Sequence, residues 1–510
     1  MNSPARWALL PLLVALNGCM TLGPDYERPD VDTGAQFTEA PPGWKEAAPA
    51  DGFRDDRWWE LYQDPLLNAL VEQLNLANPS IEVAEAQYRQ ALGLRRTAWS
   101  ALFPSLSSTS EYTRSGRGSS GGQVATTGGG YVNLSSSSSS TSEDSSSDTS
   151  SDSSSSSKSS SVISENYNVS LSASWELDLW GKLRRDLEQR RASARASAAD
   201  WASVRLSQQS QLVQSYMQLR LTDAQQRLLD HTVEAYARSL RLTENQYRAG
   251  IVPRSDVTQA EAQLKAAEAD AIDLRWQRAQ YLHAIAVLMG VPPSRLHLEE
   301  QAQLPVLPEI PVRLPSTLLE RRPDIASAER QVKAANAAMG SAKAAWVPSF
   351  SMAANGGYSS SQTKGLFTLP NRYWSLAPQA TWSLFDFGAK LGAYDQARAS
   401  HREAVANYRL LVLTGLQEVE DYLSKLQTLN REAVSREAAV TAARTSWRTL
   451  ENQYRAGLVD YTSVVVQQTS ALSSERTALT VTLNRLLTSV QLIAALGGGW
   501  DGNTRPVLED

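Results

Sequence analysis

The chain has 510 residues, of which 49 are basic and 54 are acidic, so its formal net charge is −5 at pH 7. This balance provides no basic surface of the kind that nucleic acids require, and we expect no nucleic-acid partner. Beyond the N-terminus there is no apolar run of about 18 residues, so no transmembrane helix is expected, whereas a transmembrane β-barrel carries a weaker signal and stays open.

The first residues have the pattern of a secretory signal peptide. Arg6 precedes an apolar stretch that is too short for an anchor helix, and the only cysteine of the chain, Cys19, follows Leu-Asn-Gly. This order resembles a bacterial lipoprotein box, which implies that residues 1–18 are removed and that Cys19 carries a lipid. Residues 19–60 then form a lipid-anchored N-terminal segment, and Met20, where an aspartate would favour inner-membrane retention, predicts sorting to the outer membrane.

Much of the chain occurs twice. The heptapeptide ENQYRAG stands at 244–250 and at 451–457, so the two copies are 207 positions apart. Nearer the start of each copy, Pro-Ser-Ile at 79–81 matches Pro-Asp-Ile at 323–325 at a distance of 244 positions, so the first copy contains 37 extra residues. We expect an internal two-fold repeat. Its boundaries are 61–290 for the first copy, 291–316 for a proline-rich linker, 317–497 for the second copy and 498–510 for a C-terminal tail.

The extra residues of the first copy form a loop between two strands. Residues 135–161 are almost all serine, a composition that cannot bury enough apolar surface to offset chain entropy, so we expect a disordered loop over about 115–165. After it, residues 166–179 alternate strictly between apolar and polar, which predicts a strand with one apolar face. Residues 374–384 repeat this pattern loosely, and weaker strands are predicted after Pro104 and Pro348. Each copy therefore offers one β-hairpin.

A long helical signal follows each hairpin. Residues 182–249 contain neither glycine nor proline and are rich in Ala, Leu, Gln, Glu and Arg. Gly250 and Pro253 end this helix, and Gly457 ends its counterpart. Return helices are expected at 256–289 and 461–496, so that the first helical hairpin covers 182–289. The repeated heptapeptide is then the far tip of a helical hairpin, once per copy.

No set of residues with catalytic or metal-binding spacing stands out. The four histidines are scattered, no nucleophile lies in a recognisable motif, and the glycine-rich stretch before the serine tract lacks the context of a phosphate loop. We expect neither an enzyme nor a metal site, and no cofactor besides the covalent lipid.

Two amphipathic hairpins supply four strands per chain, which are too few to close a barrel, because about eight strands are the practical minimum. An open sheet in lipid would leave its edges unpaired. Several copies would therefore complete one barrel and would gather their helical hairpins into a second, α-helical tube. The predicted fold class is mainly α with a small β part.

Short motifs along the chain resemble those of one family, the outer-membrane efflux proteins related to TolC, and specifically the NodT/OprM-like lipoprotein channels of tripartite, RND-type pumps. The motifs are Gly-Pro-Asp-Tyr-Glu-Arg-Pro at 23–29, Trp-Trp at 58–59, Asp-Pro-Leu-Leu at 64–67, Arg-Arg-Pro-Asp-Ile at 321–325 and Leu-Gly-Gly-Gly-Trp at 496–500. The resemblance implies a homotrimer with a twelve-stranded barrel in the outer membrane and an α-helical barrel crossing the periplasm. It also implies that the tips meet a periplasmic adaptor protein coupled to an inner-membrane pump.

The resemblance assigns roles to residues at the tips. Arg248, Gly250, Arg455 and Gly457 match the family's adaptor-contacting motif. A helix cap is the alternative for the arginines, and capping is part of the role of the glycines in either case.

The resemblance also implies a periplasmic gate. Asp256 matches an aspartate that in the family bonds a tyrosine matching Tyr454, and this link keeps the channel closed; a first-turn or N-cap aspartate is the alternative. Relatives carry an acidic ring in the second helix of copy two, but the matching stretch here, Ser-Val-Val-Val, has no carboxylate. We expect Thr462, Val466 and Thr469 to face the narrowest part of the lumen and to form an apolar gate.

The predicted function is a passive export duct for drugs or other small molecules across the periplasm and the outer membrane. One alternative is a structural or adhesive coiled-coil lipoprotein without a pore, which would leave the alternating strands unexplained. Another is the outer component of a metal-ion or protein export system. Because the pump selects the cargo, the residues of the duct do not name it.

Overall fold

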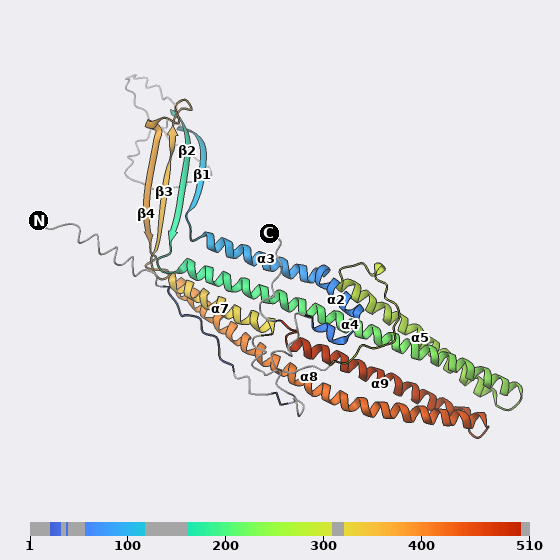
Figure 1. Ribbon diagram of the computed structural model, residues 1–510. Coiled ribbons are helices and arrows are strands. Elements are labelled where there is room, and N and C mark those ends of the chain that lie inside the picture. The colour runs from blue at the N-terminus through green and yellow to red at the C-terminus, as the bar shows by residue number, and fades with distance from the viewer. Residues whose placement is uncertain (1–20, 32–36, 39–56, 118–161, 309–320, 501–510) are drawn as a thin grey trace, which may run out of the picture. The chain divides into compact units, whose positions relative to one another are not determined.

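The computed structural model describes residues 21–31, 37–38, 57–117, 162–308 and 321–500. The signal peptide, Cys19, most of the serine-rich loop, the end of the linker and most of the C-terminal tail lie outside the described residues. The chain divides into two units, one helical and one formed by a sheet (Figure 1).

The sheet unit contains four antiparallel strands in the order β1-β2-β3-β4. They are β1 (Ser105–Arg117), β2 (Val162–Leu177), β3 (Ser349–Ser360) and β4 (Arg372–Thr381). Each copy supplies one hairpin, and β2 pairs with β3 across the copies, with Ala173 opposite Ala354. The strands β1 and β4 are the edges of the sheet.

The strands end earlier than the alternation of the sequence predicts, because the residues that follow them cap helices. The predicted strand 166–179 ends at Leu177, since the carboxylate of Asp178 accepts hydrogen bonds from the backbone N–H groups of Leu183 and Arg184, at 3.2 and 2.9 Å. The predicted strand 374–384 ends three residues early, and Asp386 accepts a hydrogen bond from the N–H of Lys390 in the same way.

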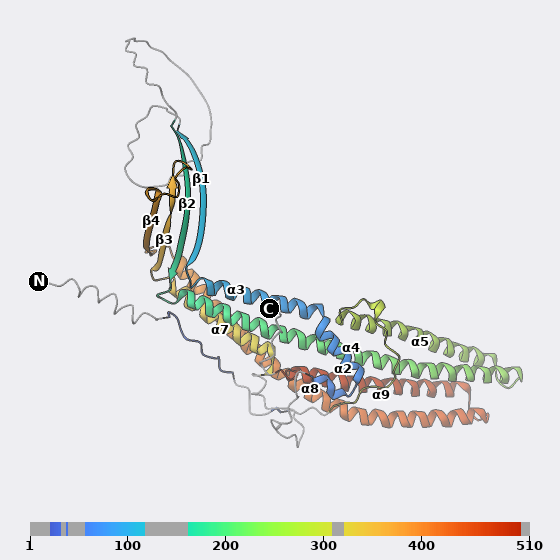
Figure 2. The same ribbon diagram turned by 45° about the horizontal axis from the view of Figure 1, so that its top comes forward.

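The helical unit contains three pairs of helices that match in length. The helices α4 (Lys182–Arg248) and α8 (Ala389–Arg455) both have 67 residues, which corresponds to about 100 Å. The return helices α5 (Arg254–Leu288) and α9 (Tyr461–Ala495) both have 35 residues. The shorter helices α3 (Pro79–Ser100) and α7 (Pro323–Ala344) both have 22. The hairpins α4–α5 and α8–α9 lie side by side with their tips at one end (Figures 1 and 2).

Among the described residues, α9 is the one helix whose length and composition would allow it to cross a membrane. Half of its most apolar window is buried inside the structure. The main core includes Val490 and Ile493 of α9 together with Trp58 and Trp59 of a short 3-10 helix, η2 (Trp58–Tyr62).

A glycine with positive φ follows the end of each return helix, Gly290 after α5 and Gly497 after α9. Gly290 has a φ of +66°, and a Cβ added to it would lie 2.2 Å from the carbonyl oxygen of Ala77, at the end of α2 (Pro65–Ala77). Gly497 has a φ of +94°, and a Cβ there would lie 2.3 Å from the carbonyl oxygen of Arg321. Both positions therefore require glycine for two reasons, the positive φ and the close approach of another backbone.

We expect Gly290→Ala to lower the free energy of unfolding by about 3 kcal/mol or more, because the new methyl group meets backbone that must move. Gly250→Ala is the matched control, since Gly250 also has a positive φ (+72°) but open space around it, and should cost about 1 kcal/mol. Thermal and urea unfolding of the two variants would measure the difference. Equal losses would show that the contact with Ala77 is not limiting.

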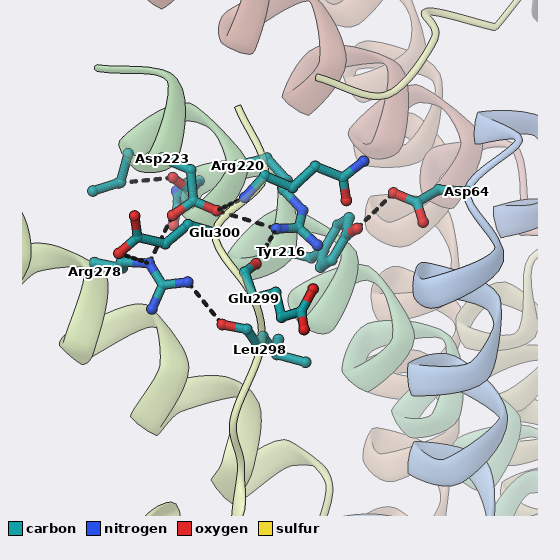
Figure 3. A network of polar contacts seen from close by, with 11 residues as sticks. Asp64, Tyr216, Arg220, Asp223, Arg278, Leu298, Glu299 and Glu300 are labelled. Atoms are coloured by element: carbon teal, nitrogen blue, oxygen red, sulfur yellow. Dashed lines mark hydrogen bonds and ion pairs between the residues drawn. The ribbon is translucent and has the colours of Figure 1, made fainter. Parts of the chain in front are cut away.

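A buried polar network joins α2, α4, α5 and the linker (Figure 3). Arg220 and Asp223 of α4 are each 1 % exposed in their side chains, and their ion pair measures 3.1 Å. Asp223 also accepts a hydrogen bond from Nε of Arg278 in α5, at 2.7 Å. The two arginines donate to linker carbonyls, Arg220 to Glu299 and Arg278 to Leu298, at 3.1 and 2.8 Å.

The network continues to the start of α2. The guanidinium of Arg220 stacks over the ring of Tyr216, whose hydroxyl donates a hydrogen bond to Asp64. Asp64 is the N-cap of α2 and accepts hydrogen bonds from the N–H groups of Leu66 and Leu67. One chain of contacts therefore fixes a helix cap, the first helical hairpin and the linker to one another.

Residues 21–31, which we call the N-terminal strap, run along α4, α7 and α8. The backbone of Leu22 bonds Trp180 at 3.2 Å, and Nδ2 of Asn336 donates to the carbonyl of Pro24 at 3.0 Å. The hydroxyl of Tyr26 donates to Glu329 at 3.2 Å. The strap thus brings residue 21 to the beginning of α4.

Candidate functional site: the tips of the helical hairpins

Both long helices end in the same hydrogen-bonded cap. At the end of α4, Gly250 N–H donates to the carbonyl of Tyr247 and Ile251 N–H donates to that of Gln246, both at 2.9 Å. At the end of α8, Gly457 N–H donates to the carbonyl of Tyr454 and Leu458 N–H donates to that of Gln453, also at 2.9 Å. This pair of bonds is the Schellman motif, and it needs a residue with positive φ, which glycine adopts without strain. Capping accounts for both tip glycines.

The tip arginines each pair with a glutamate of their own helix. Arg248 lies 3.6 Å from Glu244, and Arg455 lies 2.6 Å from Glu451. Such pairs four residues apart contribute about 0.2–0.5 kcal/mol to a helix. Both arginines remain largely exposed. The guanidinium groups are therefore available to a partner that carries acceptors.

A small apolar cluster joins the two tips. It contains Tyr454 of α8, Tyr461, Val464 and Val465 of α9, and Ala260 of α5. The rings of Tyr454 and Tyr461 have their centroids 5.4 Å apart. The cluster holds the second helical hairpin against the first.

Two hydrogen bonds cross between the hairpins at this cluster. The hydroxyl of Tyr454 donates to Oε1 of Gln246 at 2.7 Å, and Oγ of Ser239 lies 3.2 Å from the hydroxyl of Tyr461, to which it donates. The sequence-based expectation paired Tyr454 with Asp256 and missed Gln246. The presence of Gln246 in the repeated heptapeptide was the available signal.

Asp256 lies in the first turn of α5, after the N-cap Pro253. Its carboxylate accepts a hydrogen bond from the hydroxyl of Ser255 at 3.3 Å. Burial raises the pKa of Tyr454 and of Tyr461, and the negative charge of Asp256 raises both further. Asp256 therefore acts on the two tyrosines through its charge, while the hydrogen bond of Tyr454 goes to Gln246.

The predicted gate residues share one face of α9. Thr462, Val466 and Thr469 are spaced by four and three residues and are all exposed, Val466 by 57 %. Val464 and Val465, next to them in the sequence, are buried in the tip cluster. The exposed face continues towards a groove of about 510 Å³ between α9 and the first hairpin, which Thr469 and Asp270 line. Arg476 of α9 bridges to Asp270 of α5 at 3.1 Å in this groove.

The sequence matches a known family along most of the chain. The model of the family described as "Outer membrane efflux protein" matches residues 70–291 and 314–498. The chain belongs to the outer membrane efflux protein family. Its two matched stretches contain the two helical hairpins and the strands, so the family covers both tips.

Individual relatives in this family match over nearly their whole length. The probable efflux pump outer membrane protein TtgC of Pseudomonas putida is 28% identical over 499 residues, which are 97% of this chain and 96% of TtgC. The cation efflux system protein CusC of Escherichia coli is 26% identical over 504 residues, or 98% of this chain and 99% of CusC. The solved outer-membrane channel OprN superposes with a TM-score of 0.81 at 28% identity, covering 94% of this chain and 100% of OprN.

Membership of the outer membrane efflux protein family confirms the predicted resemblance, the outer-membrane location and the role in efflux. It also confirms the mainly helical fold with a small sheet, since the channel structures share it. The family is one of transport proteins.

Proposed function

We propose that the chain is the passive outer-membrane duct of a tripartite efflux pump. In this proposal three chains form a twelve-stranded barrel in the outer membrane that continues into an α-helical barrel across the periplasm. Each chain consists of two matched internal copies, 61–290 and 317–497. The observation that carries the proposal is the four-stranded sheet with two open edges. The same chain continues into two helical hairpins, whose long helices α4 and α8 have the same length.

The surface of the sheet supports the barrel. Large apolar side chains are exposed on it, namely Leu106, Leu171, Trp175, Trp374 and Leu376. An exposed apolar face on a sheet fits a lipid environment, in which every backbone group must be paired. Pairing β4 of one subunit with β1 of the next subunit would remove both edges and close the barrel.

The N-terminal strap supports lipidation of Cys19. Thr21 packs against Gly181, where an added Cβ would lie 2.9 Å from Cγ2 of Thr21. Gly181 immediately precedes α4 and follows β2 by four residues. A lipid two residues before Thr21 would thus start close to the point where the chain leaves the barrel. A relative, SilC of Salmonella typhimurium, is described as a probable outer membrane lipoprotein.

The exposed tips support contact with a periplasmic adaptor protein coupled to an inner-membrane pump. Arg248 and Arg455 leave donors free on each tip, and Ile251 and Leu458 place exposed apolar side chains beside them. We propose drugs or other small organic molecules as the cargo, in line with the efflux pumps of the Pseudomonas putida relatives, one of which is described as a toluene efflux pump protein. Selection among them would rest with the pump.

Introducing a charge at the proposed gate should change ion preference. We expect Val466→Asp to make the channel more cation-selective in planar bilayers, because a trimer would place three carboxylates around its narrowest part. Leu458→Asp is the matched control, since Leu458 is also exposed but lies in the turn before α9. An unchanged reversal potential for Val466→Asp would place Val466 outside the constriction.

Cross-linking at the tip tests the proposed function. With Cys19 lipidated, Ala249→Cys would give the mature chain one free thiol, at the cap of α4. We expect a thiol cross-linker applied to intact cells to capture a periplasmic adaptor protein. Capture of envelope proteins unrelated to a pump, together with no conductance of the purified protein in bilayers, would instead favour a structural lipoprotein without a pore.

A further inference from the structure

The tip heptapeptide is identical in the two copies, and most of its residues act within their own turn. The glutamate and arginine pair with each other, the asparagine carbonyl accepts the N–H of the capping alanine, and the glycine adopts the positive φ of the cap. These contacts involve five of the seven residues in each copy, the asparagine and the alanine through their backbone groups alone. They leave the side chains of the glutamine and the tyrosine.

The structure uses one glutamine and one tyrosine, each from a different copy. Gln246 of the first copy accepts a hydrogen bond from Tyr454 of the second copy at 2.7 Å. The complementary pair is Tyr247 of the first copy and Gln453 of the second, and among the described residues neither side chain has a polar partner. Tyr454 is 6 % exposed, whereas Tyr247, at the same position of the heptapeptide, is 44 % exposed.

We propose that Tyr247 of one subunit donates a hydrogen bond to Gln453 of a second copy of the chain. Each chain carries the exposed donor Tyr247 on its first hairpin and the half-buried acceptor Gln453 on its second. A contact between two different surfaces of the same chain is a heterologous interface. It closes into a ring when the rotation that relates neighbouring subunits divides a full turn evenly. The tips would then be joined by alternating tyrosine–glutamine bonds, within subunits and between them. This inference rests on the proposed oligomeric duct.

The two kinds of joint differ in the residues that follow the cap. Within the chain, Tyr461 packs on Tyr454 and bonds Ser239. The position equivalent to Tyr461 in the first copy is Arg254, which is exposed and charged. The joint between subunits therefore has the tyrosine–glutamine bond without the second aromatic ring. It is the weaker joint, and the tips would separate first between subunits.

Cross-linking of paired cysteines tests the joint directly. In Tyr247→Cys/Gln453→Cys, a short bismaleimide should convert the monomer band on a denaturing gel into dimer and trimer. The matched control is Gln246→Cys/Tyr454→Cys. There the same linker should bridge two positions of one chain, so no dimer or trimer band should form. The single variants Tyr247→Cys and Gln453→Cys control for linkage through Cys19 or through like positions.

The outcomes separate this inference from the proposed function. If a native gel shows a trimer and the control pair is bridged, but Tyr247→Cys/Gln453→Cys stays monomeric on the denaturing gel, the inter-subunit bond is refuted. If the native gel shows no oligomer, the proposed duct itself fails.

A double-mutant cycle gives a second readout. Tyr247→Phe and Gln453→Leu should each raise the ratio of open to closed channels in bilayers roughly a hundredfold, because a trimer would lose three such bonds. The double variant should raise it no further, because either change removes the same bond. Multiplied effects in the double variant, or no effect of either change, would contradict the pairing.

Discussion

Replacing Asp223 by alanine should lower the free energy of unfolding by about 3–5 kcal/mol. Asp223 is 1 % exposed and is the anion between two arginines, Arg220 at 3.1 Å and Arg278 at 2.7 Å. Without it, Arg220 keeps its charge in a buried position with one carbonyl partner. Removing one member of a buried ion pair is costly because the remaining charge stays desolvated.

The loss should extend beyond the ion pair. Asp223 also accepts a hydrogen bond from the N–H of Gln301 at 3.1 Å, so the variant releases the linker from α4 as well. Urea unfolding, followed by the helical signal in circular dichroism, would measure the change.

Asp230→Ala is the matched control for this prediction. Asp230 lies seven residues later on α4, is exposed, and accepts a hydrogen bond from Gln226. Its loss removes the acceptor of the Gln226 amide and should lower the free energy of unfolding by about 1 kcal/mol. If Asp223→Ala and Asp230→Ala lowered the free energy of unfolding equally, the network of Figure 3 would make no special contribution to stability.

Removing the hydroxyl of Tyr454 should open the channel. In the proposed trimer, Tyr454→Phe deletes three hydrogen bonds to Gln246, each worth about 1 kcal/mol. A total of about 3 kcal/mol corresponds to roughly a hundredfold shift in the ratio of open to closed channels. Single-channel recording in planar bilayers would report the open fraction.

The ring of Tyr454 packs on Tyr461 and remains in Tyr454→Phe, so the thermal stability should change little. Tyr394→Phe, near the other end of α8, is the control and should leave the open fraction unchanged. A closed Tyr454→Phe channel with normal stability would mean that the apolar cluster alone keeps the tips together.

The sequence alone determined the local elements of this protein. Alternation with a period of two located β2, and the absence of glycine and proline over 182–249 set the length of α4. The tip turns followed from Gly250 and Gly457, because a left-handed cap is a property of a few adjacent residues. The repeat showed that the same series of elements would occur twice.

The tertiary structure decided which residues meet across elements. Tyr454 reaches Gln246 rather than Asp256, since the partner depends on how α8 lies against α4. Packing of α9 on the tip cluster buries Val464 and Val465 and leaves Val466 exposed, although all three are valines in one run. Periodicity along a chain specifies each helix and strand, whereas contacts between elements depend on the relative positions of distant segments, which no local pattern encodes.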